Sequence, residues 1–423
     1  MKKSISNRDV ERIAQHAGLP VSRVREVLAL QGELPPETVE RVMASAQALR
    51  YTISARDRVA MAAGTSVATV NRAYRPEARH LVRPDVLERI QAEARRLGYT
   101  PDLVAQARRT QGSPIVALCV ELERLFNPYH ARMLHCLIEA FTRRDRHPVI
   151  TPILAGQPLP ELAQSGVTSA VVFWEGPRTA HQVAVLAATG RRAVVIGRHV
   201  SLPSVAPDWV TAAEALTRRA LTAGYDVLHL GYFSPDHWGP GARLEGAASA
   251  LAAHAGRPPQ FRLWVDPALD PAEAAAKLRG QGLHRAEALF GTLVQTPGAL
   301  ESHDAAQGAV IVDEMVRELD LRCGREGQRV AVLGLSDMAA RQLLHALRHS
   351  RPQWDIGREV GLVGYDNIEP LLAYLDPVLT TVSYDMGALS ERVVDLTLGE
   401  GCGRAPDFPF AVLPTQIVDR QSL

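Results

Sequence analysis

Several patterns that assign a protein to a class are missing from this chain of 423 residues. Its four cysteines lie far apart, so neither a CxxC motif nor a disulfide framework is expected. No stretch of about 18 uncharged apolar residues occurs, which argues against a transmembrane helix. The first residues, Met-Lys-Lys followed by polar residues, lack the apolar core of a signal peptide. We therefore expect a cytoplasmic protein with reduced thiols.

Motifs of enzymes and of cofactor sites are missing as well. The sequence has no GxGxxG, no GxxxxGK[ST] and no HExxH. Its 14 histidines show no metal-ligand spacing, and its acidic residues form no pair of catalytic type. We therefore expect no enzyme activity, no catalytic residues, no cofactor and no metal site.

The charge is distributed unevenly along a chain whose composition, 46% hydrophobic and 22% charged, is that of a folded protein. Residues 1–112 hold 19 Lys and Arg against 12 Asp and Glu, a net charge of +7, whereas the whole chain carries +1. The remaining residues therefore carry about −6. A basic N-terminal region favours binding to nucleic acid, because phosphates must be neutralised.

A short pattern occurs twice near the N-terminus, at residues 13–28 and 59–74. Both copies are followed by a segment with helical periodicity (84–97 in the second copy) and then by a tyrosine. The pattern predicts a helix, a tight glycine turn and a second helix, which is the motif that places a helix in the major groove of DNA. Two ordinary helical hairpins are the alternative, which the matching downstream parts disfavour. The matched residues are Ala14 and Ala60, Ala17 and Ala63, Gly18 and Gly64, Val24 and Val70, and Tyr51 and Tyr99.

Short segments spread over the chain, in a fixed order, resemble the LacI/GalR family of bacterial transcription repressors. Residues 58–112 resemble the DNA-binding head and hinge of the family, residues 12–51 the head again without a hinge, and residues 113–423 its effector domain. The segments are Val59-Ala60, Ala63-Gly64, Ser66, Thr69-Val70, Arg72, Val82, 98–102, Val104-Ala105, 126–129, 243–246, 336–339, 363–367, 377–382 and 413–415.

The resemblance implies how the two heads divide their work. It places the base-contacting positions on Val67, Ala68 and Arg72 in the second copy, and on Val21, Ser22 and Glu26 in the first. Ser66 is predicted to cap the second helix, whereas Pro20 in the first copy caps nothing. We expect the second copy to be the principal reader; the first either binds a flanking site or is a packing module. The predicted DNA contacts are Ser66, Val67, Ala68, Thr69, Asn71, Arg72, Tyr99, Arg108, Val21, Ser22 and Arg23.

The hinge departs from the family pattern. In the family a leucine of the hinge enters the minor groove and kinks the duplex. Here that position falls on Arg108, and Asp102 replaces an asparagine. An arginine enters a narrow minor groove without unstacking bases, so the resemblance does not extend to operator bending.

From residue 113 onward, apolar runs alternate with helical stretches (211–223, 243–254 and 337–348). This pattern predicts parallel sheets covered by helices on both faces. The predicted strands are Ile115–Val120, Val149–Ile153, Ala170–Trp174, Ala193–Ile196, Val227–Leu230, Phe261–Val265, Val330–Leu333 and Val360–Val363.

The overall prediction is an all-α pair of helix-turn-helix heads followed by an α/β two-lobe domain like type I periplasmic binding proteins. We call residues 1–53 the first head and residues 54–100 the second head; 101–112 is the hinge and 113–423 the effector and dimerisation domain. Lobe one is predicted at 113–223 and 367–384, lobe two at 224–366 and 385–423. The segment 286–328 exceeds the family pattern and is an extra βα unit or a lid, with a strand-like run at Ala288–Val294 and a helical one at 304–318.

The resemblance also implies an effector site between the lobes. Arg243 and Asp366 would hold ligand hydroxyls, and Ser336 stands where the family has asparagine, which suggests an unusual ligand or a weakened response. The alternatives are a salt bridge for Arg243, a turn role for Asp366, and core packing for Trp174 and Tyr384. The predicted effector residues are Tyr129, Trp174, Arg243, Ser336, Asp366 and Tyr384.

We therefore expect a repressor with three partners: a double-stranded DNA operator, a sugar or nucleoside-like effector, and a second copy of the chain. An effector-independent protein that binds or bridges DNA through tandem heads is the alternative. A small-molecule binder with a vestigial head is a third possibility. No heptad tail follows Leu413-Pro414-Thr415, so a coiled-coil tetramer is not expected, and neither is a membrane partner.

Overall fold

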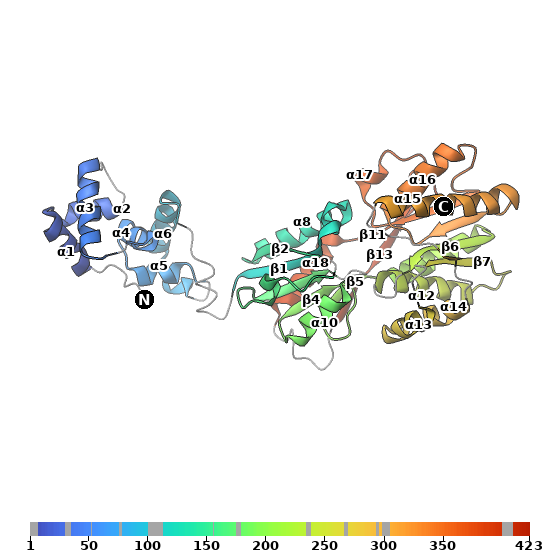
Figure 1. The fold of residues 1–423 in the computed structure, drawn as a ribbon, viewed down its shortest axis with the longest axis horizontal. Coiled ribbons are helices and arrows are strands. Elements are labelled where there is room, and N and C mark those ends of the chain that lie inside the picture. The colour runs from blue at the N-terminus through green and yellow to red at the C-terminus, as the bar shows by residue number, and fades with distance from the viewer. Residues whose placement is uncertain are drawn as a thin grey trace. The chain divides into compact units, whose positions relative to one another are not determined.

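The computed structural model describes residues 7–29, 35–51, 53–75, 78–99, 113–154, 156–174, 179–233, 238–265, 270–292, 296–297, 305–399 and 409–423. The chain divides into two compact units, Met1–Gln106 and Ala107–Leu423 (Figure 1). In the described part of the chain, no helix combines the length and the apolar character needed to cross a membrane.

The N-terminal unit consists of two three-helix groups, each with its own apolar core. Ile13, Val24 and Val42 are fully buried in the first, and Val59, Val70 and Ile90 occupy a like position in the second. The helices are α1 (Asn7–Ala17), α2 (Val21–Ala29) and α3 (Pro36–Ala48), then α4 (Ala55–Ala62), α5 (Val67–Ala73), the 3-10 turn η1 (Arg79–Leu81) and α6 (Pro84–Arg96).

The first sheet of the C-terminal unit is parallel throughout, in the strand order β12-β5-β4-β3-β1-β2. Alternate residues of β1 enter different cores: Val116 and Leu118 pack with α8 and α18, whereas Ala117 and Cys119 pack on the other face with α10. The elements are β1 (Ile115–Glu121), η2 (Leu122–Phe126), α8 (Pro128–Arg143), β2 (His147–Ile153), α9 (Glu161–Gln164), β3 (Ala170–Trp174), α10 (Ala180–Ala188), β4 (Ala193–Ile196), β5 (Ser204–Pro207), α18 (Met386–Leu398) and β12 (Phe410–Leu413).

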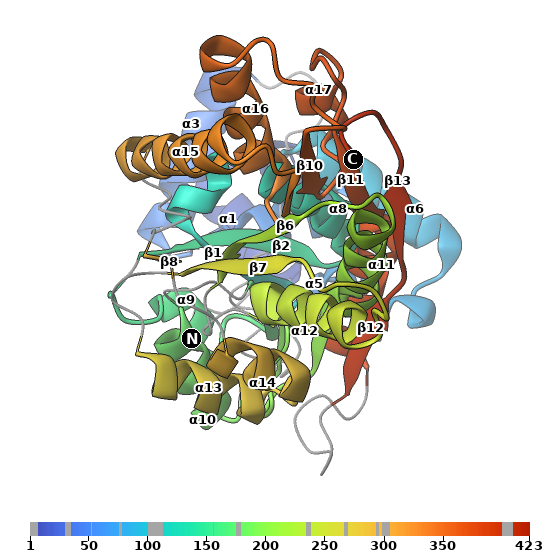
Figure 2. The same ribbon diagram turned by 90° about the vertical axis from the view of Figure 1, so that its right-hand side faces the viewer.

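The second sheet has the order β13-β11-β10-β9-β6-β7-β8, and only β13 runs antiparallel to its neighbour among the described pairings. Helices α11 and α12 lie side by side on one face (Figure 2), and α15 and α16 cover the other. The elements are α11 (Trp209–Thr222), β6 (Val227–Phe233), α12 (Trp238–Ala252), β7 (Gln260–Val265), α13 (Pro271–Gly280), α14 (His284–Thr292), β8 (Thr296–Pro297), α15 (Ala305–Leu319), the π-helical η3 (Asp320–Arg325), β9 (Val330–Leu333), α16 (Asp337–Ser350), β10 (Val360–Tyr365), α17 (Glu369–Leu372), β11 (Thr380–Tyr384) and β13 (Thr415–Val418).

The chain passes between the two lobes at other places than the sequence predicts. Helix α11 belongs to the second lobe, because its buried face packs against α12 and the second sheet. Strand β11 also lies in the second lobe, since Val363 of β10 pairs with Thr380. In contrast, α18 packs on α8, and β12 pairs with β5 of the first lobe. The predicted boundaries near 224 and 367 are therefore wrong. A crossing near 384 does occur, but it leads from the second lobe to the first, opposite to the predicted direction, and a further crossing follows β12.

The strand-like run at Ala288–Val294 is a second correction. Residues 284–292 form α14, because Leu283, Ala286 and Phe290 are buried at helical spacing against the second lobe. The predicted helix at 304–318 corresponds to α15 at 305–319. The extra segment therefore adds helices and the short edge strand β8 to the second sheet.

Candidate functional site

The second head contains a helix-turn-helix with both helix starts capped. Ser54 and Asp57 form a reciprocal capping box at α4. Gly64 makes the turn with a φ of +62°, a conformation that glycine adopts without strain. The Ser66 hydroxyl then accepts a hydrogen bond from the Thr69 amide at 3.1 Å, so Ser66 caps α5 as predicted. These three devices fix where α5 begins and in which direction it leaves the turn.

The first head repeats this backbone. Gly18 has the same φ of +62°, and the Leu19 amide donates to the Ala14 carbonyl at 3.0 Å, as the Thr65 amide does to Ala60 at 2.8 Å. The third helices also end alike, with Arg50 at a φ of 59° where the second head has Gly98 at 60°. The two heads therefore share one backbone plan.

The surfaces that the two turn-following helices offer are different. On α5, Ala68 and Arg72 are exposed, and Arg72 has no hydrogen-bond or ion-pair partner among the residues described; Ser66 is exposed too, and Val67, Thr69 and Asn71 are half-buried. On α2, Ser22 is exposed and Val21 is half-buried, while Arg23 is paired with Glu26 at 2.7 Å.

Two further predicted contacts lie elsewhere. Tyr99 is half-buried and accepts a hydrogen bond from Arg56 Nε at 3.2 Å, with its ring 5.7 Å from that of Tyr74, so much of its surface is used within the head. Arg108, together with the rest of the predicted hinge, lies outside the described residues.

Aromatic side chains from both sheets meet in the C-terminal unit. The hydroxyls of Tyr129, in the first turn of α8, and Tyr384, the last residue of β11, are 2.6 Å apart. The Tyr129 ring lies 5.7 Å from Trp174 at the end of β3, and Trp209 lies 5.6 Å from Tyr384. Because these residues follow the carboxyl ends of parallel strands, they occupy the edge where ligands bind in such folds. Burial raises the pKa of Tyr129 and of Tyr384, and the nearby Asp366 carboxylate raises both further.

Arg243 of α12 closes this cluster on the side of the second lobe. Its guanidinium carbon lies 4.0 Å from the ring centroid of Tyr365 and 5.2 Å from that of Trp209. Its Nη1 donates to the Gly334 carbonyl at 2.8 Å, whereas its buried Nε has no hydrogen-bond partner among the described residues. Stacking therefore fixes the plane of the guanidinium and leaves donor capacity for a ligand.

The Asp366 carboxylate stands on a strained loop that buried groups hold in place. Asp366 and Asn367 have φ values of 100° and 47°, which non-glycine residues rarely adopt. Buried Asp337 accepts hydrogen bonds from the Ile368 amide at 2.7 Å and from the Thr381 hydroxyl at 2.6 Å. Ser336, next to it, caps α16 through the Ala339 amide at 3.3 Å. Asp337 is therefore a positioning residue for the loop.

Asp337 should make stability depend on pH in a defined window. Burial raises the pKa of its carboxyl from 3.8 to about 6, although its two hydrogen bonds act in the opposite direction. The folded state thus binds the proton more tightly, so its stabilising effect is complete below pH 3.8 and is lost as pH rises through about 6. We expect Asp337→Asn, compared with the parent by denaturant unfolding, to remove a fall of up to about 3 kcal/mol between these limits. Parallel profiles for the two proteins would contradict this assignment.

Sequence reasoning missed several members of the cluster. Trp209 and Tyr365 were not predicted, and neither was the buried ion pair of Glu121 and Arg124 at 2.8 Å, whose arginine also approaches His130 at 3.3 Å. Trp209 begins α11 two residues after β5, an unpredicted strand, and Tyr365 ends β10 immediately before the predicted Asp366. The rule that aromatic residues gather at the carboxyl ends of parallel strands would have found Tyr365, because β10 was predicted, but not Trp209, because β5 was not.

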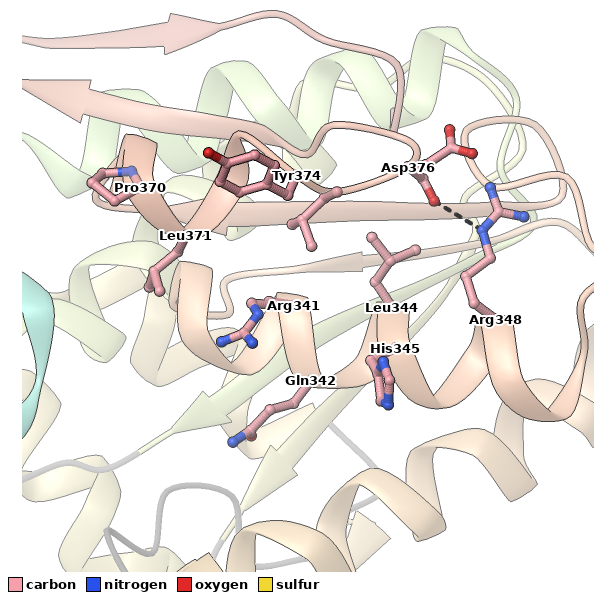
Figure 3. Close-up of a pocket in the computed structure, with 10 residues that line it drawn as sticks. Arg341, Gln342, Leu344, His345, Arg348, Pro370, Leu371, Tyr374 and Asp376 are labelled. Atoms are coloured by element: carbon pink, nitrogen blue, oxygen red, sulfur yellow. Dashed lines mark hydrogen bonds between the residues drawn. The ribbon is translucent and has the colours of Figure 1, made fainter.

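A separate hollow lies on the second lobe (Figure 3). It has a volume of about 650 Å³ and lies between α16 and the segment that contains α17. Arg348 on its wall donates through Nε to the Asp376 carbonyl at 2.9 Å. No predicted effector residue lines it, and none of the described residues form a group that could hold a metal ion.

Comparisons with known proteins agree with this architecture. Residues 291–423 match the family described as periplasmic binding protein-like domain. The chain is 25% identical over 377 residues to the HTH-type transcriptional regulator GalS of Salmonella typhimurium, an alignment that covers 83% of this chain and 91% of GalS. Its fold resembles that of the transcriptional regulator CelR in complex with cellobiose, with a TM-score of 0.52, 18% identity and coverage of 98% of this chain and 99% of CelR.

A second solved structure is similar over most of the chain. The lac repressor dimer bound to operator and the anti-inducer ONPF gives a TM-score of 0.60 at 17% identity, covering 86% of this chain and 97% of the repressor. These relatives are transcriptional regulators rather than enzymes. A helical N-terminal region followed by a two-sheet periplasmic-binding-protein-like domain is common to them and to this chain. The chain is thus similar in sequence to the transcriptional regulator GalS, and its fold is similar to those of CelR and the lac repressor.

Proposed function

We propose that this regulator is a repressor that binds a duplex DNA operator through its second head and responds to a small molecule held by the cluster around Arg243. The observation that carries the proposal is the cluster itself. Tyr129, Trp174, Arg243 and Tyr384 come from both lobes and meet where the chain passes between them. A ligand that binds there contacts both lobes, so its binding energy depends on how the lobes are arranged.

In this proposal the chain has four parts. Residues 1–53 and 54–100 are two helix-turn-helix heads, 101–112 is a hinge, and 113–423 is the effector and dimerisation domain. The second head is the reader, because Ser66 caps its α5 and exposed Arg72 is unpaired among the described residues. The first head is auxiliary, because Pro20 provides no side-chain cap and because Glu26, paired with Arg23, stands where the second head has Arg72.

The effector in this proposal is a hydroxylated molecule, such as a sugar or nucleoside. Aromatic rings pack on sugar faces. An arginine donates hydrogen bonds to ligand hydroxyls, whereas a carboxylate accepts hydrogen bonds from them. Arg243 supplies the donor and Asp366 the acceptor. The cellobiose named with CelR supports a sugar within this class.

The test measures DNA affinity and ligand binding together. The full chain selects its preferred duplex from random sequence, and sugars and nucleosides are screened by thermal shift. We expect at least one stabilising compound to change operator affinity, and the operator to change the affinity for that compound by the same factor. A compound that binds without any change in operator affinity would contradict effector-responsive regulation, and failure to select any duplex would contradict the DNA-binding role.

We also propose a homodimer that pairs through the first lobe. The edge strand β2 exposes apolar side chains to solvent, with Val149 at 38% and Ile150 at 40% exposure. Exposed apolar edges favour association with another chain. We expect Ile150→Asp to shift sedimentation toward the monomer, with Val200→Asp, 69% exposed outside the named strands, as control. An unchanged dimer in Ile150→Asp would place the interface elsewhere.

A further inference from the structure

The two heads are joined by a specific contact. Helix α2 of the first head packs against α4 of the second, and these two helices are labelled side by side in Figure 1. Ile53, which directly precedes the Ser54 cap of α4, and Met61, near the other end of α4, both pack against the core of the first head. The first head therefore lies along the length of α4.

Arg96 of α6 completes the joint. Its Nη2 donates to the Ala29 carbonyl, the last of α2, at 2.8 Å, while its Nε pairs with Glu93 at 2.7 Å. Ala29 and Leu28 are 2% and 1% exposed. Carbonyls at a helix C-terminus have no partner within the helix and attract cations. Arg96, which belongs to the second head, therefore caps the C-terminus of α2 in the first head. Glu93 holds the Arg96 guanidinium in position.

The Arg96 bond lies at the C-terminal end of α2. The N-terminal half, which helix-turn-helix proteins turn toward DNA, stays accessible: Ser22 and Arg25 are exposed, and so is Arg8 at the start of α1. Among the described residues, the Arg25 side chain makes one long hydrogen bond, 3.4 Å, to Asn7. The first head as a whole carries a net charge of +2, which suits a phosphate surface.

The position of α4 on DNA determines where α2 comes to lie. When a helix-turn-helix places its second helix in the major groove, its first helix crosses the sugar-phosphate backbone. In the second head, the helix that crosses the backbone is α4, and α2 lies beside it. The first head is thus held on the backbone side of the second head, next to the duplex beyond the groove that α5 occupies.

We propose that the first head binds the backbone of the DNA flanking the half-site of the second head, and that Arg96 holds it there. The inference rests on the proposed DNA-binding function of the second head. Glu26 stands at the position that Arg72 occupies in the second head, and it is paired with Arg23. The first head therefore has no arginine there to contact bases, and we expect its contact with the flanking DNA to depend on charge rather than on base sequence. The occupant of this surface is therefore double-stranded DNA of any sequence, adjacent to the selected site.

The test combines probe length with full-length variants. One probe carries the selected half-sites with long flanks and the other is trimmed to the half-sites; affinity is measured over a range of salt. We expect the parent to prefer the long probe. Arg25→Ala should lower the salt slope on the long probe by about one for each lost phosphate contact and leave the trimmed probe unaffected. Arg96→Ala should abolish the preference, and Arg96→Lys, which still donates a hydrogen bond, should restore it.

Arg95→Ala is the matched control, because Arg95 is the exposed neighbour on α6 and bonds only to the Gln91 carbonyl within the described residues. Arg95→Ala removes the same charge as Arg96→Ala, and we expect it to keep the preference for the long probe. If the parent binds both probes equally well, the flank contact does not exist, although the second head still binds its operator. If the parent binds neither probe, the proposed function itself fails. Equal weakening of Arg96→Ala on both probes would make Arg96 a direct DNA contact and overturn the joint.

Discussion

Arg72→Ala is expected to weaken binding to the selected operator by about 1–3 kcal/mol for each half-site. A dimer places two copies of Arg72 on one operator, so the total loss is roughly 2–6 kcal/mol if both copies contact bases. The Arg72 side chain is exposed on α5 and unpaired among the described residues, so it need not give up an interaction with them when it binds DNA. Its removal should also relax the preference at one base pair, since an arginine hydrogen-bonds a guanine edge through two atoms.

The control for Arg72 is Arg89→Ala on α6. Arg89 is 56% exposed and lies 3.9 Å from Asp85, so this variant loses the same charge from another surface of the same head. Binding curves to the operator and to a scrambled duplex separate the two roles. A loss by Arg72→Ala that is equal on both duplexes would make the residue a phosphate contact and leave base selection to other residues.

The sequence predicted the elements of the C-terminal unit better than their assembly. Apolar runs identified eight strands, because a strand buried on both faces has a continuous apolar pattern. The lobe boundaries failed, because strand pairing is a long-range property: nothing near Thr380 in the sequence indicates that its partner is Val363. Helix α14 was mistaken for a strand because Ala288, Leu289 and Phe290 form a short continuous apolar run, which periodicity alone cannot assign to a strand or to a helix.

The candidate site could be predicted only where the residues have a family counterpart. Arg243 and Asp366 were placed by resemblance, and the structure brings them to the same cluster. Trp209 and Asp337 had no such signal, because the contacts that define them depend on where β5 and β11 end. In the heads, the repeat predicted two like units, but the joint through Arg96 and Ala29 links residues 67 positions apart and has no local pattern.

Arg243→Met is expected to abolish the response to the effector. Methionine keeps an unbranched side chain against Tyr365 and Trp209 but has no hydrogen-bond donor. The guanidinium offers the unpartnered Nε beside the bonded Nη1, and each charge-assisted hydrogen bond to a ligand contributes about 1.5–3 kcal/mol. Losing two of them costs roughly 3–6 kcal/mol, which is a fall in ligand affinity of more than about 100-fold.

Operator binding without ligand separates this effect from misfolding. Arg243→Met should bind operator as the parent does and fail to respond to the compound found by thermal shift. Arg218→Met serves as control, since Arg218 is 61% exposed on α11 and pairs with Glu214 at the surface, where such pairs contribute little. If Arg243→Met retained the parent's ligand affinity, the unpartnered Nε would be a structural feature, and the ligand would be held by the tyrosines and Asp366 alone. Because Arg243 is the cation stacked between the two second-lobe rings of this cluster, its removal tests the effector site more directly than removal of any single aromatic residue.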